Sequence, residues 1–246
     1  MLFQLLVHLT LMIGTLMFKV LILLLLIGSS VQASCIKDVF KVGAGFDSLI
    51  LSGERGSDNL DIVSDSGLSL RFNWIIYCPD SGLEISPYFY FRNYTFSKFD
   101  DGGEIEEFNS ASIGSTFLKT YSFGDLFVDI FTREEIGVGQ GEGNDKITDV
   151  YYDNLGILGG YGFNYFKGNS SRMDAKAAAG ILIPSEDMFE TGLIVRLSTD
   201  FLYKISKKFS LVFDIYLEHY EQNNSDIDLY LSREEFGINS SIIFRI

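Results

Sequence analysis

The chain alternates apolar and polar residues with a period of two in ten separate stretches. A β-strand points successive side chains to opposite faces, so this alternation predicts strands with one apolar face. In the ninth stretch, for example, Phe209, Leu211 and Phe213 alternate with polar residues such as Ser210 and Asp214. The ten predicted strands cover residues 40–47, 68–76, 83–92, 110–121, 126–133, 154–165, 175–183, 192–203, 209–218 and 235–246.

Charged residues in these stretches fall on the parity opposite to the apolar residues. The exception is Lys119, which lies near a strand end, where a lysine can reach the membrane interface. The charged parity holds seven residues of each sign, which favours ion pairs because an unpaired buried charge is costly. These residues are Lys41, Asp47, Arg71, Glu84, Arg92, Asp129, Arg133, Lys176, Arg196, Asp200, Asp214, Glu218, Glu235 and Arg245.

The glycines indicate which parity faces inward. On a solvated face they would only weaken the strands, whereas inside a narrow barrel they make room for long charged side chains from across the lumen. A polar lumen and an apolar outer band predict an all-β fold, a transmembrane antiparallel up-and-down β-barrel. A soluble lipocalin-like barrel or a sandwich is the alternative. The glycines on the charged parity are Gly43, Gly45, Gly114, Gly156, Gly160, Gly162, Gly180, Gly192 and Gly237.

The connections between the predicted strands alternate in length. Long acidic loops are expected at residues 51–66, 97–108, 136–149 and 221–233, and short turns include residues 123–125 and 206–208. Long outer loops and short periplasmic turns are typical of transmembrane barrels, although the outer connection at residues 184–187 is short. Both termini are then periplasmic, with about ten strands; eight or twelve remain open because weak strands are easily miscounted.

The first 33 residues predict a secretory signal peptide. Lys19 precedes an apolar core at residues 20–27, and Val31 and Ala33 occupy the two small-residue positions before a cleavage site. We therefore expect a mature barrel at residues 34–246, with Met17 as an alternative start of the chain. An uncleaved membrane anchor and a lipoprotein acylated at Cys35 are the competing interpretations.

The signal peptide, the alternating strands and the terminal strand at residues 236–246 resemble the small bacterial outer-membrane β-barrel proteins. The resemblance is one of pattern over residues 38–246. It implies a Gram-negative outer-membrane location and recognition by the barrel-assembly machinery. The chain departs from that family's usual aromatic last residue, because Ile246 is last and Phe244 stands two positions earlier on the same face.

Composition narrows the chemistry. The net charge of −14 and the lack of basic clusters argue against a nucleic-acid partner. Two cysteines do not have the spacing of a zinc site, but Cys35 lies before the first predicted strand and Cys78 follows the second. Neighbouring antiparallel strands place these ends side by side in the oxidising periplasm, so we expect a disulfide between them. We expect no cofactor.

His219 is the one histidine outside the predicted signal peptide. It lies on the lipid-facing parity, and we expect an interfacial residue rather than a catalytic base because no adjacent acid is expected on its own face. The glycine-rich segment at residues 137–143 is expected to be a mobile loop. Acidic loop residues either keep the surface hydrophilic or bridge divalent cations to lipopolysaccharide phosphates: Asp58, Asp61, Asp65, Asp100, Asp101, Glu104, Glu106, Glu107, Glu142, Asp145, Asp149, Asp226 and Asp228.

These observations favour a non-enzymatic integral barrel with a charge-paired lumen and a structural or surface-interacting role. Its expected partners are outer-membrane lipid and lipopolysaccharide. A narrow porin for small polar solutes is the first alternative, because lumen charges can line a channel as well as close it. An outer-membrane hydrolase is the second.

Overall fold

The computed structural model describes residues 35–55, 58–96, 104–140, 146–185, 189–224 and 229–246. The signal peptide predicted at residues 1–33, and with it the cleavage site and the alternative start at Met17, lies outside these residues. Within the described part of the chain, no helix has the length and apolar character needed to cross a membrane.

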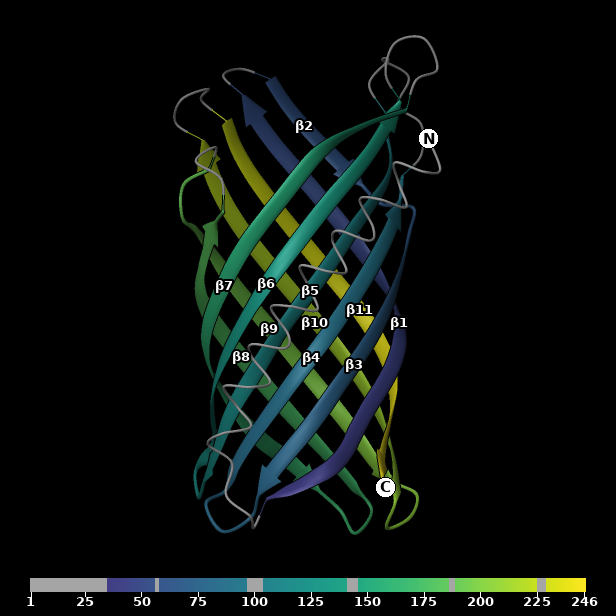
Figure 1. Ribbon diagram of the computed structural model, residues 1–246, viewed down its shortest axis with the longest axis vertical. Coiled ribbons are helices and arrows are strands. Elements are labelled where there is room, and N and C mark those ends of the chain that lie inside the picture. Colours follow the sequence, from purple (N-terminus) through teal and green to yellow (C-terminus); the bar gives the residue numbers. More distant parts are fainter. Residues whose placement is uncertain (1–34, 56–57, 97–103, 141–145, 186–188, 225–228) are drawn as a thin grey trace.

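The described residues form a closed antiparallel barrel (Figure 1). Ten strands make its wall, each paired with its sequence neighbours, and β11 pairs with β1 to close the cylinder. The predicted all-β up-and-down barrel of about ten strands is therefore confirmed. The wall strands are β1 (Ile36–Arg55), β3 (Ser66–Cys78), β4 (Leu83–Thr95), β5 (Glu104–Tyr121), β6 (Gly124–Gln140), β7 (Lys146–Lys167), β8 (Ser171–Pro184), β9 (Gly192–Lys204), β10 (Phe209–Asn224) and β11 (Leu229–Arg245).

One end of the barrel carries short turns and both ends of the described chain. The β3–β4 turn contains Gly82 with φ 63°, and Gly124, with φ 143°, follows the two residues that separate β5 from β6. Both values lie in the left-handed region, which glycine adopts without steric cost. This end corresponds to the periplasmic side predicted from the short connections.

An eleventh strand, β2 (Asp58–Val63), was not predicted. It pairs antiparallel with β1 from Ile50 to Arg55 and extends the wall at the end opposite the C-terminus (Figure 1). Several other segments expected to be loops also continue as strands. Residues 104–108 belong to β5, residues 136–140 to β6 and residues 146–149 to β7. The expected mobile loop at residues 137–143 is thus wrong for residues 137–140, and residues 141–143 lie outside the description.

The two parities of each strand face opposite sides of the wall. On β10, Phe213, Ile215 and Leu217 are exposed on the outer surface, whereas Asp214 and Glu218 are buried in the lumen. The same contrast separates the exposed Val195 from Ile194 on β9. The outer apolar run on β10 covers residues 209–217, which matches the roughly 9–11 residues of a transmembrane strand.

Aromatic side chains mark the periplasmic edge of this apolar band. Tyr121 and Phe123 stack at the β5–β6 turn, with ring centroids 5.2 Å apart. On the neighbouring strand, Tyr161, Phe163 and Tyr165 form a continuous exposed row. Aromatic belts of this kind lie at the headgroup level of membrane proteins. Lys119 lies at the same end and donates a hydrogen bond to the backbone oxygen of Ser81, as an interfacial lysine would.

Several lumen glycines make room for aromatic rings on the adjacent strand, and others lie against polar side chains or the backbone of that strand. A Cβ atom at Gly156 would overlap the ring of Phe131, its cross-strand partner. Phe127 covers Gly160 in the same way, and a Cβ atom at Gly237 would collide with Tyr216 and Asp47. These glycines face the lumen, as predicted, but the space that they leave is filled by groups on the adjacent strands and not by side chains from across the barrel.

Candidate functional site

The charged lumen could carry a solute or help to close the barrel, and its described charges form three groups along the axis. The group nearest the periplasmic end joins two basic residues to one carboxylate. Lys41 lies 3.4 Å and Arg71 3.0 Å from the side-chain oxygens of Asp214. Lys176 pairs with Asp200 at 2.6 Å on the adjacent strands β8 and β9. These cations keep part of their surface in solvent, so this end of the lumen is open to water.

The middle group crosses the lumen. Glu218 on β10 accepts from Arg133 on β6 at 2.5 Å and from Arg196 on β9 at 2.6 Å. Arg196 also reaches Asp129, at 2.8 Å. The side chains of Arg133 and Glu218 are each 1% exposed, so this is a buried ion pair that ties non-adjacent strands together.

The third group continues toward the outer end. Arg92 on β4 lies 2.9 Å from Glu235 on β11, and Arg233 joins Glu235 to Glu135 on β6. Tyr216 donates to Glu235, and Tyr220 donates to Glu135 at 2.9 Å. Every charged member of this group is buried.

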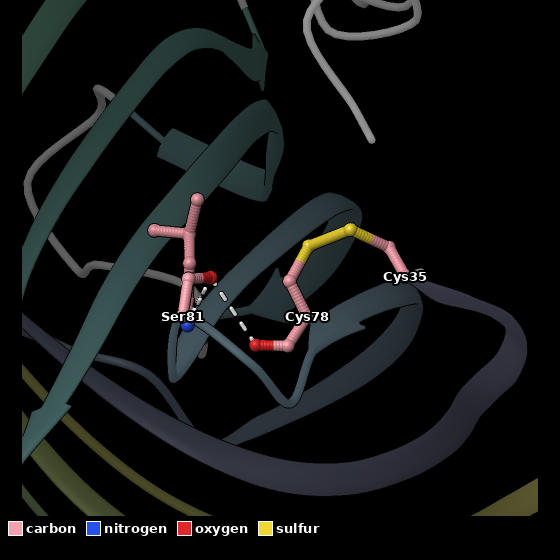
Figure 2. Close-up of a disulfide and its surroundings, with 4 residues drawn as sticks. Cys35, Cys78 and Ser81 are labelled. Atoms are coloured by element: carbon pink, nitrogen blue, oxygen red, sulfur yellow. Dashed lines mark hydrogen bonds between the residues drawn. A yellow bond between two sulfur atoms is a disulfide. The ribbon is translucent and has the colours of Figure 1, made fainter. Parts of the chain in front are cut away.

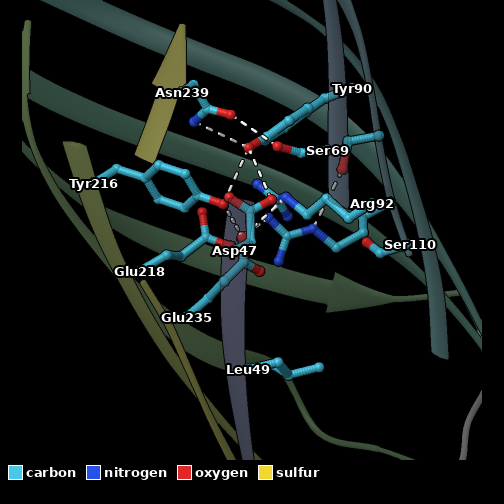
Figure 3. A network of polar contacts seen from close by, with 12 residues as sticks. Asp47, Leu49, Ser69, Tyr90, Arg92, Ser110, Tyr216, Glu218, Glu235 and Asn239 are labelled. Carbon is cyan, nitrogen blue, oxygen red and sulfur yellow. Dashed lines mark hydrogen bonds and ion pairs between the residues drawn. The ribbon is translucent and has the colours of Figure 1, made fainter. Parts of the chain in front are cut away.

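Polar side chains connect the groups. Tyr90 donates to the hydroxyl of Tyr216 at 3.0 Å (Figure 3). Asn239 donates to Asp214 at 3.1 Å. Asp47 lies beside both tyrosines and accepts from Tyr90 at 3.5 Å. The network therefore runs from the periplasmic opening toward the outer end without leaving the lumen.

The structure places thirteen of the fourteen predicted lumen charges on the inner wall. Glu84 faces the periplasmic opening from the start of β4 and stays partly exposed. Arg245 is the exception, because it is exposed at the end of β11 and stands outside the network.

Sequence reasoning missed Glu135 and Arg233. Both continue the charged parity of their strands, two residues beyond Arg133 and two before Glu235. They were assigned to loops or loop edges because the apolar alternation had ended. Extending the alternation of inward and outward positions beyond the apolar stretch of each strand would have identified both residues.

Apolar side chains also fill the lumen. Phe131, Leu158, Leu182 and Ile194 pack with Tyr220 in one buried cluster. A second cluster, nearer the outer end, joins Leu49 to Tyr94, Phe96 and Phe108. The charged parity is therefore not uniformly polar, and the two apolar clusters occupy part of the lumen together with the ion pairs.

The structure joins Cys35 and Cys78 by a disulfide, with a Cα separation of 4.1 Å (Figure 2). The bond connects the residue before β1 to the last residue of β3, at the periplasmic end. Ser81 donates to the carbonyl oxygen of Cys78 at 3.2 Å and so orders the turn beside it. The two cysteines form a structural cross-link, and as a disulfide their sulfur atoms are not metal ligands.

His219 faces outward from β10, just above the apolar band, but the expected lack of an adjacent acid is wrong. Its Nε2 lies 3.0 Å from Glu221, two residues along the strand, and its Nδ1 lies 3.6 Å from Glu234 on β11. Residues two apart on a strand share a face, and His219 and Glu234 are cross-strand partners. The His219 imidazole and the Glu221 carboxylate could exchange a proton through this contact.

The acidic residues predicted as loops lie on strands, in the short connection between β2 and β3, or in undescribed segments. Asp58 and Asp61 lie on β2, Asp65 lies between β2 and β3, and Asp149 lies on β7. Among the residues that the structure describes, no three His, Cys, Asp or Glu side chains are grouped so as to hold a metal ion. Glu104, Glu106 and Glu107 lie on β5, and the undescribed members are Asp100, Asp101, Glu142, Asp145, Asp226 and Asp228.

No protein-family model and no curated protein matches the sequence. Among solved structures, the chain is similar to the outer-membrane protease OmpT of Escherichia coli, with 7% identity, a TM-score of 0.49 and coverage of 87% of this chain and 99% of that one. The translocator domain of the autotransporter NalP of Neisseria meningitidis gives 11% identity, a TM-score of 0.47 and coverage of 84% and 88%. The COG4313 outer-membrane channel of Pseudomonas putida gives 10%, 0.45, 86% and 96%.

The barrel's own surfaces decide what kind of protein this is. An apolar outer band can be stable only in lipid, and lipid requires every strand to be paired, as the closed wall provides. A charged lumen and short turns at one end complete the pattern. The chain therefore has the fold and the surfaces of an integral outer-membrane β-barrel protein.

Proposed function

We propose that the protein is a non-enzymatic outer-membrane barrel whose lumen is closed and whose role is structural or surface-interacting. The observation that carries this proposal is the buried ion pair between Arg133 and Glu218, because it crosses the lumen at its middle. Breaking it would leave charges unpaired in a low-dielectric space, which costs several kcal/mol. Opening a path for solutes at this level is therefore unfavourable.

The apolar side chains support the same proposal. Phe131, Leu158 and Ile194 are apolar side chains that a water-filled channel would not favour, yet they are buried in the lumen beside the middle group of ion pairs. The guanidinium carbon atoms of Arg133 and Arg196 lie 5.1 Å and 5.6 Å from the centre of the Phe131 ring. The proposed partners are outer-membrane lipid and lipopolysaccharide on the outer wall, and the barrel-assembly machinery during insertion. A narrow porin remains the alternative function for the same lumen.

Conductance in planar lipid bilayers tests the proposal. We expect no stepwise conductance from the purified wild-type barrel, whereas the double variant Phe131→Ala/Leu158→Ala should conduct because it removes the apolar closure. The variant also shows that insertion was achieved in the assay. Steady open-channel steps from the wild-type protein would favour the porin and end the proposal of a closed lumen.

A further inference from the structure

The outer wall has a hollow of 520 Å³ within the apolar band. Its origin lies in the strand register. Ala44 on β1 is paired with Ser240 on β11, and both are small and exposed. Leu70 flanks Ala44 on one side, and Phe213 flanks Ser240 on the other. The row therefore reads large, small, small, large across four neighbouring strands.

Larger side chains close the hollow along the strand direction. Phe46 and Ile238 form the next row toward the outer end, and Phe46 is 73% exposed. Val42 and Ile242 form the row toward the periplasm, and both are exposed. The hollow is thus a recess in the part of the wall that faces hydrocarbon, so its occupant must itself be apolar.

A charged cluster lies farther along the same strands. His219, Glu221 and Glu234 stand on the outer face of β10 and β11, directly beyond the last apolar residues, Leu217 and Phe236. The side chains of Glu221 and Glu234 are 44% and 55% exposed, so they are available to a headgroup. With two carboxylates and one imidazole, the cluster complements a cation such as an ammonium group.

The spacing between hollow and cluster fits one leaflet. Glu234 and Ile238 share the outer face of β11 and are four residues apart, which is about 13 Å along a strand. Half of the hydrocarbon core of a bilayer is roughly 15 Å thick. A lipid with its headgroup at the cluster can therefore extend an acyl chain past Phe236 into the hollow.

We propose that the β11–β1 wall binds one outer-leaflet lipid, with an acyl chain in the hollow at Ala44 and Ser240 and an ammonium-bearing headgroup on the His219–Glu221–Glu234 cluster. This site is independent of whether the lumen conducts. It gives the outer wall a specific ligand class in addition to the bulk lipid that surrounds it.

Native mass spectrometry of the detergent-solubilised barrel tests this inference. The probes are phosphatidylethanolamine, which carries an ammonium group, and phosphatidylglycerol, which does not. We expect one phosphatidylethanolamine to bind at least about tenfold more tightly than phosphatidylglycerol, which corresponds to about 1.4 kcal/mol.

Two sets of variants locate the lipid. Ala44→Phe or Ser240→Leu fills the hollow and should reduce phosphatidylethanolamine binding about tenfold. Ala179→Phe, at an exposed position of β8 that does not line the hollow, should not reduce it. Glu221→Gln/Glu234→Gln should abolish the preference between the two lipids. Asp80→Asn, in the turn at the opposite end of the barrel, should keep it.

Heat-dependent migration on gels verifies that each variant is folded before it is compared. Equal binding of both lipids by the wild type would overturn the proposal, as would undiminished binding by both hollow-filling variants. A dimer that displaces lipid and is lost in Ala44→Phe would assign the hollow to a second copy of this chain and would also overturn it.

Discussion

The lumen wall and the outer wall of this barrel are built from alternate residues of the same strands, yet they obey different rules. The outer wall needs only apolar side chains, because lipid accepts any apolar shape, and Val195 and Phe213 are exposed there. The lumen wall needs defined partners, and Glu218 meets two arginines from two other strands. The contrast teaches that the outward face of each strand specifies the environment of the barrel, whereas the inward face specifies its shape.

Removing a partner from the middle of the lumen should have the largest effect. Glu218→Ala leaves Arg133 buried without its carboxylate, and we expect a loss of about 3–5 kcal/mol in the free energy of unfolding. Denaturant titration of the barrel folded into lipid vesicles measures this loss. Asp200→Ala is the control, because its partly exposed pair with Lys176 should contribute less than about 1 kcal/mol. Equal effects at the two sites would mean that burial does not set the strength of the lumen pairs.

The disulfide lies at the end of the strands and belongs to neither wall. Its contribution to the free energy of unfolding can be compared with the contributions of both walls. The double variant Cys35→Ser/Cys78→Ser should lower the stability by about 3–4 kcal/mol in the chain-entropy model, given the 43-residue separation of the two cysteines. The same titration with and without reductant on the wild type measures the effect. A variant as stable as the oxidised wild type would show that strand pairing alone holds this end.

A charge on the outer wall should cost somewhat less. Val195→Arg and Phe213→Arg each place a guanidinium against hydrocarbon, and we expect losses of about 2–4 kcal/mol near the bilayer midplane. Val195→Leu is the matched control and should change little. Losses below about 0.5 kcal/mol at both positions would contradict the assignment of this face to lipid.

The smallest expected effect separates the two faces of a single strand. Gly156→Ala on β7 forces a methyl group into the ring of Phe131, and overpacking of this kind costs about 1–3 kcal/mol. Gly159 on the same strand has no atom within 4 Å of an added Cβ, so Gly159→Ala should be neutral or slightly stabilising. Thermal or denaturant midpoints of the two variants give the comparison directly. Similar losses would argue that glycine acts here through strand flexibility and not through space.

The sequence predicts the barrel well where the strands touch lipid, because lipid imposes an apolar residue at every second position. It predicts the strands poorly beyond the apolar band. On β6 and β10 the chain remains a strand after the alternation ends, and β7 begins before its alternation starts. Residues 136–140, 146–149 and 221–224 therefore read as loops. The same loss of signal hid β2, which pairs only with β1.

The lumen was harder to predict than the outer wall for a physical reason. Parity shows that Glu135 and Arg233 point inward once their strands are extended, but parity does not show that they meet each other. Their pairing depends on how β6 and β11 face each other across the closed cylinder. The charged cluster at His219 was missed for a simpler reason, because Glu221 shares its parity and was counted in a loop.

The position of the disulfide along the chain bears on the order in which the barrel closes. Both cysteines lie within the first 78 residues, whereas β11, which completes the seam with β1, ends at Arg245. In a chain that emerges N-terminus first, an oxidant can link β1 to β3 before β11 is available. The first strand is then tethered to its neighbour while the last one searches for its register. β11 then meets an edge, β1, that the disulfide already holds to β3.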